Sequence, residues 1–122
     1  MNAKYNQSEQ DYIESILMLS QSRTVVHRVD VAKKMNVSQA AVNKAMKLLA
    51  EKGYLYEDGK HLYLTETGKA YAETVYEKHC ILRDFLIYLG VSPARAEEDA
   101  CNMEHIVSDE TFAAMKTKLE NN

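Results

Sequence analysis

Proline and glycine are scarce in this chain of 122 residues, which holds one proline and four glycines. With no low-complexity stretch either, the composition argues against intrinsic disorder. No apolar run approaches the roughly 18–20 residues that span a bilayer, and residues 1–7 hold no apolar segment of a secretory leader. We therefore expect a cytoplasmic protein with no membrane partner.

Cysteine is also rare, at two residues, Cys80 and Cys101. Without a leader, the two indicate reduced intracellular thiols rather than a disulfide framework. Several enzyme motifs are missing: the chain has no His-Glu-x-x-His, no glycine-rich phosphate loop and no nucleophile elbow. We therefore expect a small regulatory or binding protein and no enzyme.

Charge is unevenly distributed along the chain. Residues 23–60 carry eight basic and four acidic side chains, a net charge of +4, whereas the rest carries seven basic and fourteen acidic ones, a net charge of −7. A basic middle between acidic ends is typical of a nucleic-acid surface, although the whole chain is acidic at −3.

Hydrophobic periodicity and capping residues predict six helices and one hairpin. We expect helices over residues 8–22, 29–35, 39–52 and 66–89, a fifth from Pro93 to Met103 or His105, and a last one that Ser108 opens and that runs to about Leu119. The two alternating strands flank Asp58-Gly59, which is a strong hairpin signal. Residues 24–29 are rich in β-branched side chains and predict a brief extended segment.

Two short helices joined by a three-residue turn and followed by a hairpin are the order of a winged helix-turn-helix, whose helix 39–52 would enter the major groove. Hydroxyl, amide and ammonium groups at the outward positions of that helix suit base edges and phosphates. These candidate DNA-binding residues are Ser38, Gln39, Ala40, Asn43, Lys44 and Lys47. The alternative is a small α+β domain with a solvated lysine face.

A second signal is the segment Cys101-Asn-Met-Glu104-His105. Spacings of i, i+3 and i+4 place a thiol, a carboxylate and an imidazole on one helix face, where they could bind a metal. Further donors are Asp11 and Glu14, three residues apart, and His79. Each has an ordinary explanation: solvated first-turn acids for the pair, and a half-buried helix residue for His79.

The sequence alone assigns no function to two other groups of residues near these donors. Cys80 is typical of a small hydrophobic residue in a core or interface. The run Glu97-Glu98-Asp99 is typical of an exposed acidic stretch. We therefore count neither as a ligand group.

These residues resemble the family of bacterial metalloregulators that includes the diphtheria toxin repressor and the manganese transport regulator. The resemblance covers nearly the whole chain. It rests on Asp11-Tyr-Ile-Glu14, on 31–42, 49–55 and 64–69, on His79, and above all on Glu98-Asp-Ala-Cys-Asn-Met-Glu-His105.

The family implies a mainly α fold with a small β-hairpin wing. A winged helix-turn-helix DNA-binding domain would occupy residues 1–65 and a helical metal-binding and dimerisation domain residues 66–122. The implied protein is a homodimeric repressor of metal-uptake genes that binds a palindromic double-stranded operator with divalent metal as corepressor. We expect no C-terminal SH3-like domain of the iron-type regulators.

Carried over by position, the implied metal ligands are Asp11, Cys101, Glu104 and His105, with Glu14 and His79 added from the manganese branch. Asp11 matches the manganese branch and Cys101 the iron branch, so no bridging carboxylate stands at position 101. Arg83 stands where the iron branch has a glutamate of its ancillary site, so that by this resemblance Glu97 or Glu14 would have to complete a second site with His79. A thiolate with carboxylates favours Fe²⁺, with Mn²⁺ next and with Zn²⁺ or Co²⁺ binding in vitro.

The resemblance also implies that ligands come from both domains, so that the metal would select one arrangement of them. Phe85, Leu86 and Leu89 end the long helix and are candidates for the dimer interface, because so small a monomer can hardly cover an apolar stripe. Two other functions remain open: a winged-helix regulator that senses redox state through its cysteines, and a small metal-binding module that does not bind DNA.

Overall fold

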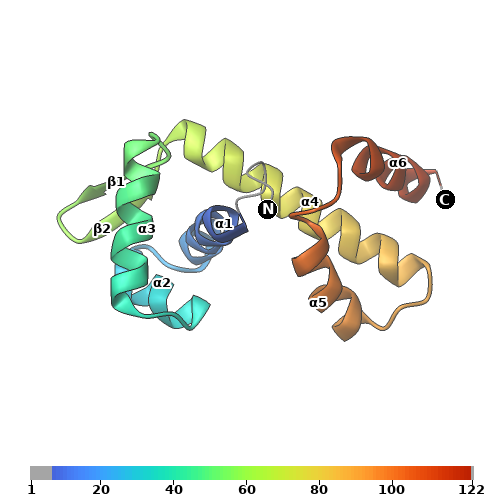
Figure 1. The fold of residues 1–122 in the computed structure, drawn as a ribbon, viewed down its shortest axis with the longest axis horizontal. Coiled ribbons are helices and arrows are strands. Elements are labelled where there is room, and N and C mark those ends of the chain that lie inside the picture. The colour runs from blue at the N-terminus through green and yellow to red at the C-terminus, as the bar shows by residue number, and fades with distance from the viewer. Residues whose placement is uncertain (1–6, 122) are drawn as a thin grey trace. The chain divides into compact units, whose positions relative to one another are not determined.

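The computed structural model describes residues 7–121 and shows six helices and one two-stranded hairpin in that range (Figure 1). Residues 1–6, where we expect no leader, and Asn122 lie outside the described residues. The elements are, in order, α1 (Gln7–Ser22), α2 (Arg28–Met35), α3 (Gln39–Glu51), β1 (Leu55–Asp58), β2 (His61–Leu64), α4 (Glu66–Tyr88), α5 (Pro93–Met103) and α6 (Asp109–Glu120). The chain forms two compact units, which divide between Glu73 and Thr74, inside α4. The predicted domain boundary at residue 65 lies just before that helix.

All six predicted helices are present, and where an end differs it differs by one residue once the fifth is taken to end at Met103. The turn between α2 and α3 is built on Asn36, which has φ of 56° and lets α2 end in a left-handed cap. Asparagine tolerates this conformation better than most residues. Ser38 then caps α3 by accepting a hydrogen bond from the Ala41 amide, so the short turn sets the path from one helix into the next.

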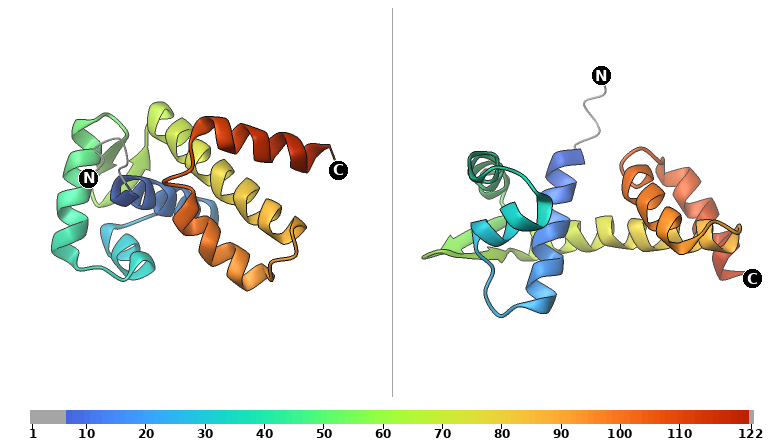
Figure 2. Two further views of the ribbon diagram at one scale, coloured as in Figure 1. Left: turned by 45° about the vertical axis from the view of Figure 1, so that its right-hand side comes forward. Right: turned by 90° about the horizontal axis from the view of Figure 1, so that it is seen from below.

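The hairpin pairs Leu55 with Leu64 and Asp58 with His61 in antiparallel register. The connecting residues are therefore Gly59 and Lys60, so the predicted loop Asp58-Gly59 was wrong by one residue. Gly59 has φ of +64°, which is the requirement at the first loop position of a type II′ turn. The predicted extended segment contributes one hydrogen bond to the hairpin, from the Leu62 amide to the Val26 carbonyl at 2.8 Å. The hairpin projects at the edge of its unit (Figure 2).

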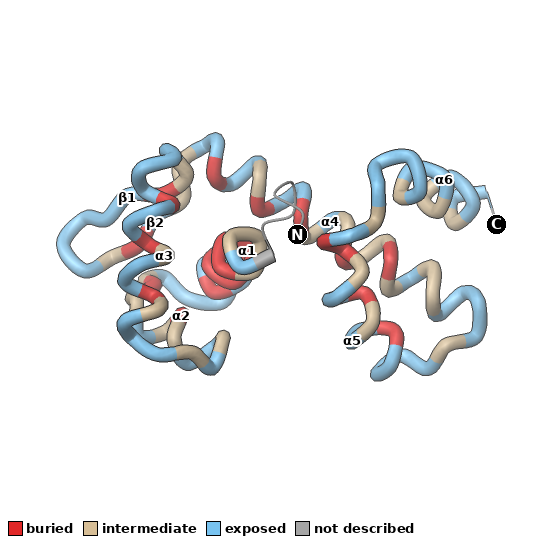
Figure 3. The backbone as a smooth tube through the Cα atoms, in the orientation of Figure 1, coloured by how far each residue is buried: buried red, intermediate tan, exposed pale blue. Residues whose placement is uncertain are grey.

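The first unit has a continuous hydrophobic core (Figure 3). Its buried members come from α1, α2, α3, the hairpin and the segment before α2: Tyr12, Ile16, Leu19, Val26, Val31, Val42, Met46, Leu49, Leu55 and Leu62. Val42, Met46 and Leu49 recur at the spacing of one helix face. That face anchors α3 and leaves its opposite side exposed.

The second unit contains the rest of α4 together with α5 and α6. Val75 and Leu82 of α4 and Ala96 and Ala100 of α5 are buried. Small alanines on α5 permit a close approach of helices. Ser92 and Ser108 cap α5 and α6 by accepting backbone hydrogen bonds. Within residues 7–121, no helix is both long and apolar enough to cross a bilayer.

Candidate nucleic-acid interface and metal centre

The exposed side of α3 carries the six residues that the sequence selects. Ser38, Gln39, Ala40, Asn43, Lys44 and Lys47 are all exposed. Their neighbours Val42 and Met46, on the other side of the helix, are fully buried. The same burial pattern that fixes α3 in the core therefore presents two amides, a hydroxyl and two ammonium groups to solvent.

A polar network ties this face to the hairpin and to the start of α2. The Arg28 guanidinium donates from Nε and Nη2 to the two oxygens of Glu57 on β1, at 2.8 and 2.5 Å. Its remaining Nη1 donates to Oδ1 of Asn43 at 3.0 Å. Gln39 Nε2 donates to the same oxygen at 3.1 Å. One arginine thus joins three elements that are distant in the sequence.

The Arg28–Glu57 pair is a two-pronged ion pair with both side chains about two-thirds covered, at 31% and 28% exposure. The hydrogen bond from Arg28 lowers the pKa of Glu57 below its usual range, and the hydrogen bond to Glu57 raises the pKa of Arg28. Bidentate arginine–carboxylate pairs are the more stable kind of surface ion pair. A concave space of about 570 Å³ adjoins the pair and is bordered also by His27, Val29, Gln39, Gly59 and Lys60.

In the second unit, His79 of α4 meets Cys101 and Glu104 at the end of α5. One donor atom from each residue lies within 4.8 Å of the others. His79 and Glu104 are buried, whereas Cys101 is exposed. Helical spacing explains the local part, because Cys101 and Glu104 are three residues apart. The packing of α5 on α4 adds the histidine.

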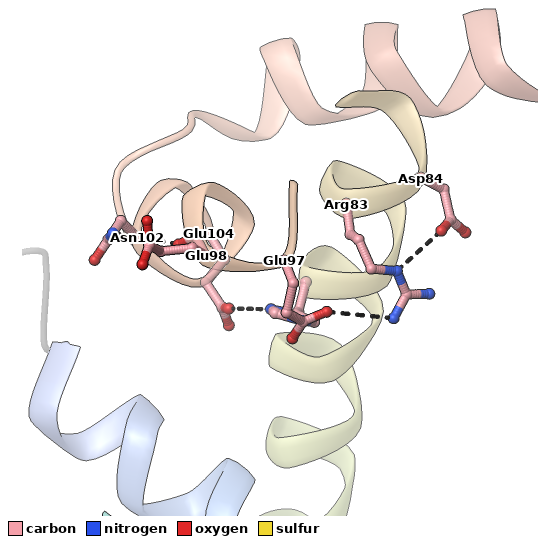
Figure 4. A network of polar contacts seen from close by, with 7 residues as sticks. Arg83, Asp84, Glu97, Glu98, Asn102 and Glu104 are labelled. Atoms are coloured by element: carbon pink, nitrogen blue, oxygen red, sulfur yellow. Dashed lines mark hydrogen bonds and ion pairs between the residues drawn. The ribbon is translucent and has the colours of Figure 1, made fainter. Parts of the chain in front are cut away.

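Both nitrogens of the His79 ring are hydrogen bonded. Nδ1 lies 2.8 Å from Oε1 of Glu104, and Nε2 lies 2.6 Å from Oε2 of Glu97. The Glu104 hydrogen bond, helped by the nearby charges and opposed by burial, raises the pKa of His79 to about 9. Oε1 of Glu97 in turn forms an ion pair with Nη1 of Arg83 on α4, at 3.7 Å (Figure 4).

This cluster fits a divalent metal ion. Oε2 of Glu104 is buried and accepts no hydrogen bond from any described residue. A buried carboxylate oxygen without a donor is costly, and a bound cation would supply the missing charge. Imidazole, thiolate and carboxylate together make a donor set for a first-row transition metal rather than for Mg²⁺ or Ca²⁺.

The group formed by His79, Cys101 and Glu104 does not include the other three predicted ligands. His105 is buried beside Glu104 in the chain, at 5% exposure. Asp11 and Glu14 lie on α1, in the first unit, where Glu14 is buried and Asp11 half-buried. The role of each of these residues as a ligand stays a prediction.

Sequence reasoning undervalued Glu97 and missed the Arg28–Glu57 pair. Glu97 is exposed, as expected of an acidic stretch, yet it reaches His79. Its spacing from Cys101 and Glu104, at i+4 and i+7, places all three on one face of α5 and could have signalled the contact. No local pattern could have paired Arg28 with Glu57, which lie 29 residues apart.

The candidate dimer residues lie in the last turn of α4 and directly after it. Phe85 and Leu86 are half-buried, and Leu89 is 61% exposed. Ile87 and Tyr88 beside them are also exposed. The second unit therefore presents a group of apolar side chains at this end of α4.

Two family models match consecutive parts of the chain. Residues 4–62 match the N-terminal DNA-binding domain of iron-dependent repressors. Residues 65–122 match their metal-binding and dimerisation domain. The candidate nucleic-acid face falls in the first match, and the metal cluster in the second.

Individual relatives agree with the family that these two models indicate. The chain is 39% identical over 107 residues to the transcriptional regulator MntR of Escherichia coli O6:H1, covering 87% of this chain and 69% of that protein. It is 34% identical to an uncharacterized HTH-type transcriptional regulator of Methanocaldococcus jannaschii, covering 94% of each. A solved manganese-dependent transcriptional repressor in complex with manganese matches 93% of this chain with a TM-score of 0.83 at 28% identity. This chain spans about half of that solved chain, at 53%.

Proposed function

This chain belongs to the iron-dependent repressor family of metal-dependent transcriptional regulators, and from that membership we propose that it is a homodimeric repressor with Fe²⁺ or Mn²⁺ as corepressor. Its target would be a palindromic double-stranded operator of metal-uptake genes. The observation that carries the proposal is the His79–Cys101–Glu104 cluster, in the part of the chain that matches the metal-binding domain.

DNA recognition would use the exposed face of α3. Lys44 and Lys47 would contact phosphates, while Gln39 and Asn43 would reach base edges. In a homodimer a two-fold axis relates two copies of α3, so that the half-sites of the operator are expected about 34–36 Å apart, or a multiple of that distance.

Metal binding would use His79, Cys101 and Glu104, with His105, Asp11 and Glu14 as further proposed ligands. The ion would supply positive charge beside buried carboxylates, which favours approach to phosphates. Cys101 as a thiolate favours Fe²⁺, Co²⁺ or Zn²⁺, whereas the carboxylates favour Mn²⁺ or Fe²⁺. Fe²⁺ satisfies both preferences, and Mn²⁺ comes next.

The test is an anaerobic DNA-binding titration on the duplex upstream of the protein's own gene, with chelator, Mn²⁺, Fe²⁺ or Zn²⁺. We expect tight binding only with metal. Cys101→Ala should change the order of the metals, and His105→Ala should abolish the metal response while the helical circular dichroism stays unchanged. The matched control is Cys80→Ala, because Cys80 lies outside the cluster.

Equal binding with chelator and with every metal would contradict the corepressor role. A metal response that survives in His105→Ala would remove that residue from the site. If no duplex binds under any metal condition, the proposal of a repressor is wrong and a metal-binding module without DNA remains.

A further inference from the structure

The network of Arg28, Glu57, Asn43 and Gln39 leaves one orientation for the Asn43 amide. A guanidinium carries only hydrogen-bond donors, so the Asn43 atom 3.0 Å from Arg28 Nη1 must be the oxygen Oδ1. Gln39 must then turn its own NH₂ towards that oxygen, at 3.1 Å. The amide orientations of both side chains follow from the arginine.

Arg28 is itself held in place. Its Nε and Nη2 are both used by the carboxylate of Glu57, and this fork leaves Nη1 directed at α3. Glu57 lies on β1 opposite Leu62, and Leu62 is anchored in the core. The hairpin therefore orients the arginine, and the arginine orients Asn43.

The consequence concerns what Asn43 offers to a ligand. Its oxygen already accepts two hydrogen bonds, whereas no described residue accepts one from its Nδ2. An asparagine binds adenine with both ends of its amide: its oxygen accepts from the N6 amino group and its NH₂ donates to N7. With the oxygen engaged, only the NH₂ group remains to contact a base. It matches O6 and N7 of guanine or O4 of thymine, whereas adenine places its N6 amino donor beside N7, so that two donor groups would face each other.

We propose that Arg28 and Glu57 act as positioning residues that hold Asn43 as a hydrogen-bond donor, so that it selects guanine or thymine and discriminates against adenine in the major groove. This inference rests on the proposed function, because it requires α3 to contact DNA. The inference adds a base preference to the proposed function. It also gives the hairpin a part in recognition, through Glu57.

The experiment is selection from a library of duplexes with a randomised core, by Mn²⁺-loaded protein under anaerobic conditions, followed by sequencing. Affinities for the selected duplex are divided by those for a duplex of random sequence, which removes general charge effects. The informative variants are Asn43→Asp and Arg28→Lys. Asn43→Asp keeps the acceptor for Arg28 and replaces the donor by an acceptor. Arg28→Lys keeps the charge and removes the fork.

The wild-type protein should select guanine or thymine at the base that responds to position 43. Asn43→Asp should lose about tenfold for that base, the usual effect of one mismatched position, and should favour cytosine or adenine, whose amino groups donate. Arg28→Lys should accept adenine at the same base about as well as guanine or thymine, because Asn43 can then turn its amide.

Two control variants separate this effect from charge. Gln21→Glu adds the same negative charge at an exposed position of α1, and Lys33→Arg makes the reverse basic exchange on α2 at an exposed position. Both should select the wild-type motif. Thermal melts by circular dichroism confirm that every variant folds.

Selection of adenine by the wild-type protein, or one unchanged motif in both informative variants, would overturn the inference and leave the repressor proposal intact. If the wild-type protein bound no duplex at all, both the inference and the repressor proposal would be overturned. A motif that changes in Asn43→Asp but not in Arg28→Lys would also overturn it, because the arginine would then have no positioning role.

Discussion

Among the four glycines, Gly68 is the one whose identity its neighbours constrain most tightly. A Cβ at this position would lie 1.8 Å from the backbone oxygen of Tyr54. That carbonyl accepts the Thr65 amide at 3.0 Å, and the Thr65 hydroxyl caps α4 by accepting the Gly68 amide at 3.0 Å. The loop after α3 therefore packs directly against the first turn of α4.

We expect Gly68→Ala to destabilise the protein by about 3 kcal/mol or more, because a backbone atom rather than a flexible side chain must move. The matched control is Gly59→Ala, where nothing lies within 4 Å and only the positive φ of 64° opposes the change. That variant should lose about 1 kcal/mol. Urea unfolding at neutral pH measures both, and equal losses would contradict the close contact.

At the scale of elements, the hairpin is attached to the helices through few links. Val26 holds it by one backbone hydrogen bond, and Leu55 and Leu62 place one face in the core. Tyr56 and Tyr63 stack on the other face with ring centres 5.2 Å apart. The Arg28–Glu57 pair is the ionic link among these, so it should affect stability in a pH-dependent way.

Glu57→Gln tests that link. The folded-state pKa of Glu57 is lowered, so its contribution is fully present above the unfolded pKa of about 4.3 and is lost as the pH falls through the folded value. We expect a loss of about 0.5–1 kcal/mol at pH 7, and none in strong acid, where the wild-type carboxyl is also protonated. Urea unfolding at pH values from 7 down to strong acid measures this loss of stability, with Asp58→Asn as the neighbouring control. An equal loss at both ends would exclude an ionic origin.

At the scale of the whole molecule, the described units leave apolar surface uncovered at the end of α4. Ile87, Tyr88 and Leu89 are 39%, 46% and 61% exposed. The matching family domain is described as a dimerisation domain. Apolar side chains gathered at one place are typical of a protein interface.

We expect sedimentation equilibrium at micromolar concentration to give twice the 13.9 kDa mass of one chain. Leu89→Glu should weaken the dimer about tenfold or more, because a charge would be buried at the interface. The control is Leu48→Glu, a similarly exposed leucine on α3, which should leave the dimer intact. A wild-type monomer, or a dimer insensitive to Leu89→Glu, would contradict this interface.

Much of the fold could be predicted from the sequence because its signals are local. Ser38, Ser92 and Ser108 each sit where a helix begins, and each accepts a backbone hydrogen bond in the structure. The three-residue spacing of Cys101 and Glu104 likewise placed both on one helix face. The exception is the hairpin turn, where Gly59 could stand first or second in the loop, and only the register of the pairing chose between them.

The sequence by itself therefore determined the order of elements, the polar face of α3 and the metal-competent face of α5, because helix periodicity acts over four residues. Tertiary structure alone decided which distant groups meet them. Packing brought His79 to Glu104 over 25 residues, and Glu57 to Arg28 over 29. Such contacts follow from how whole helices and strands bury their apolar faces, and no short pattern encodes them.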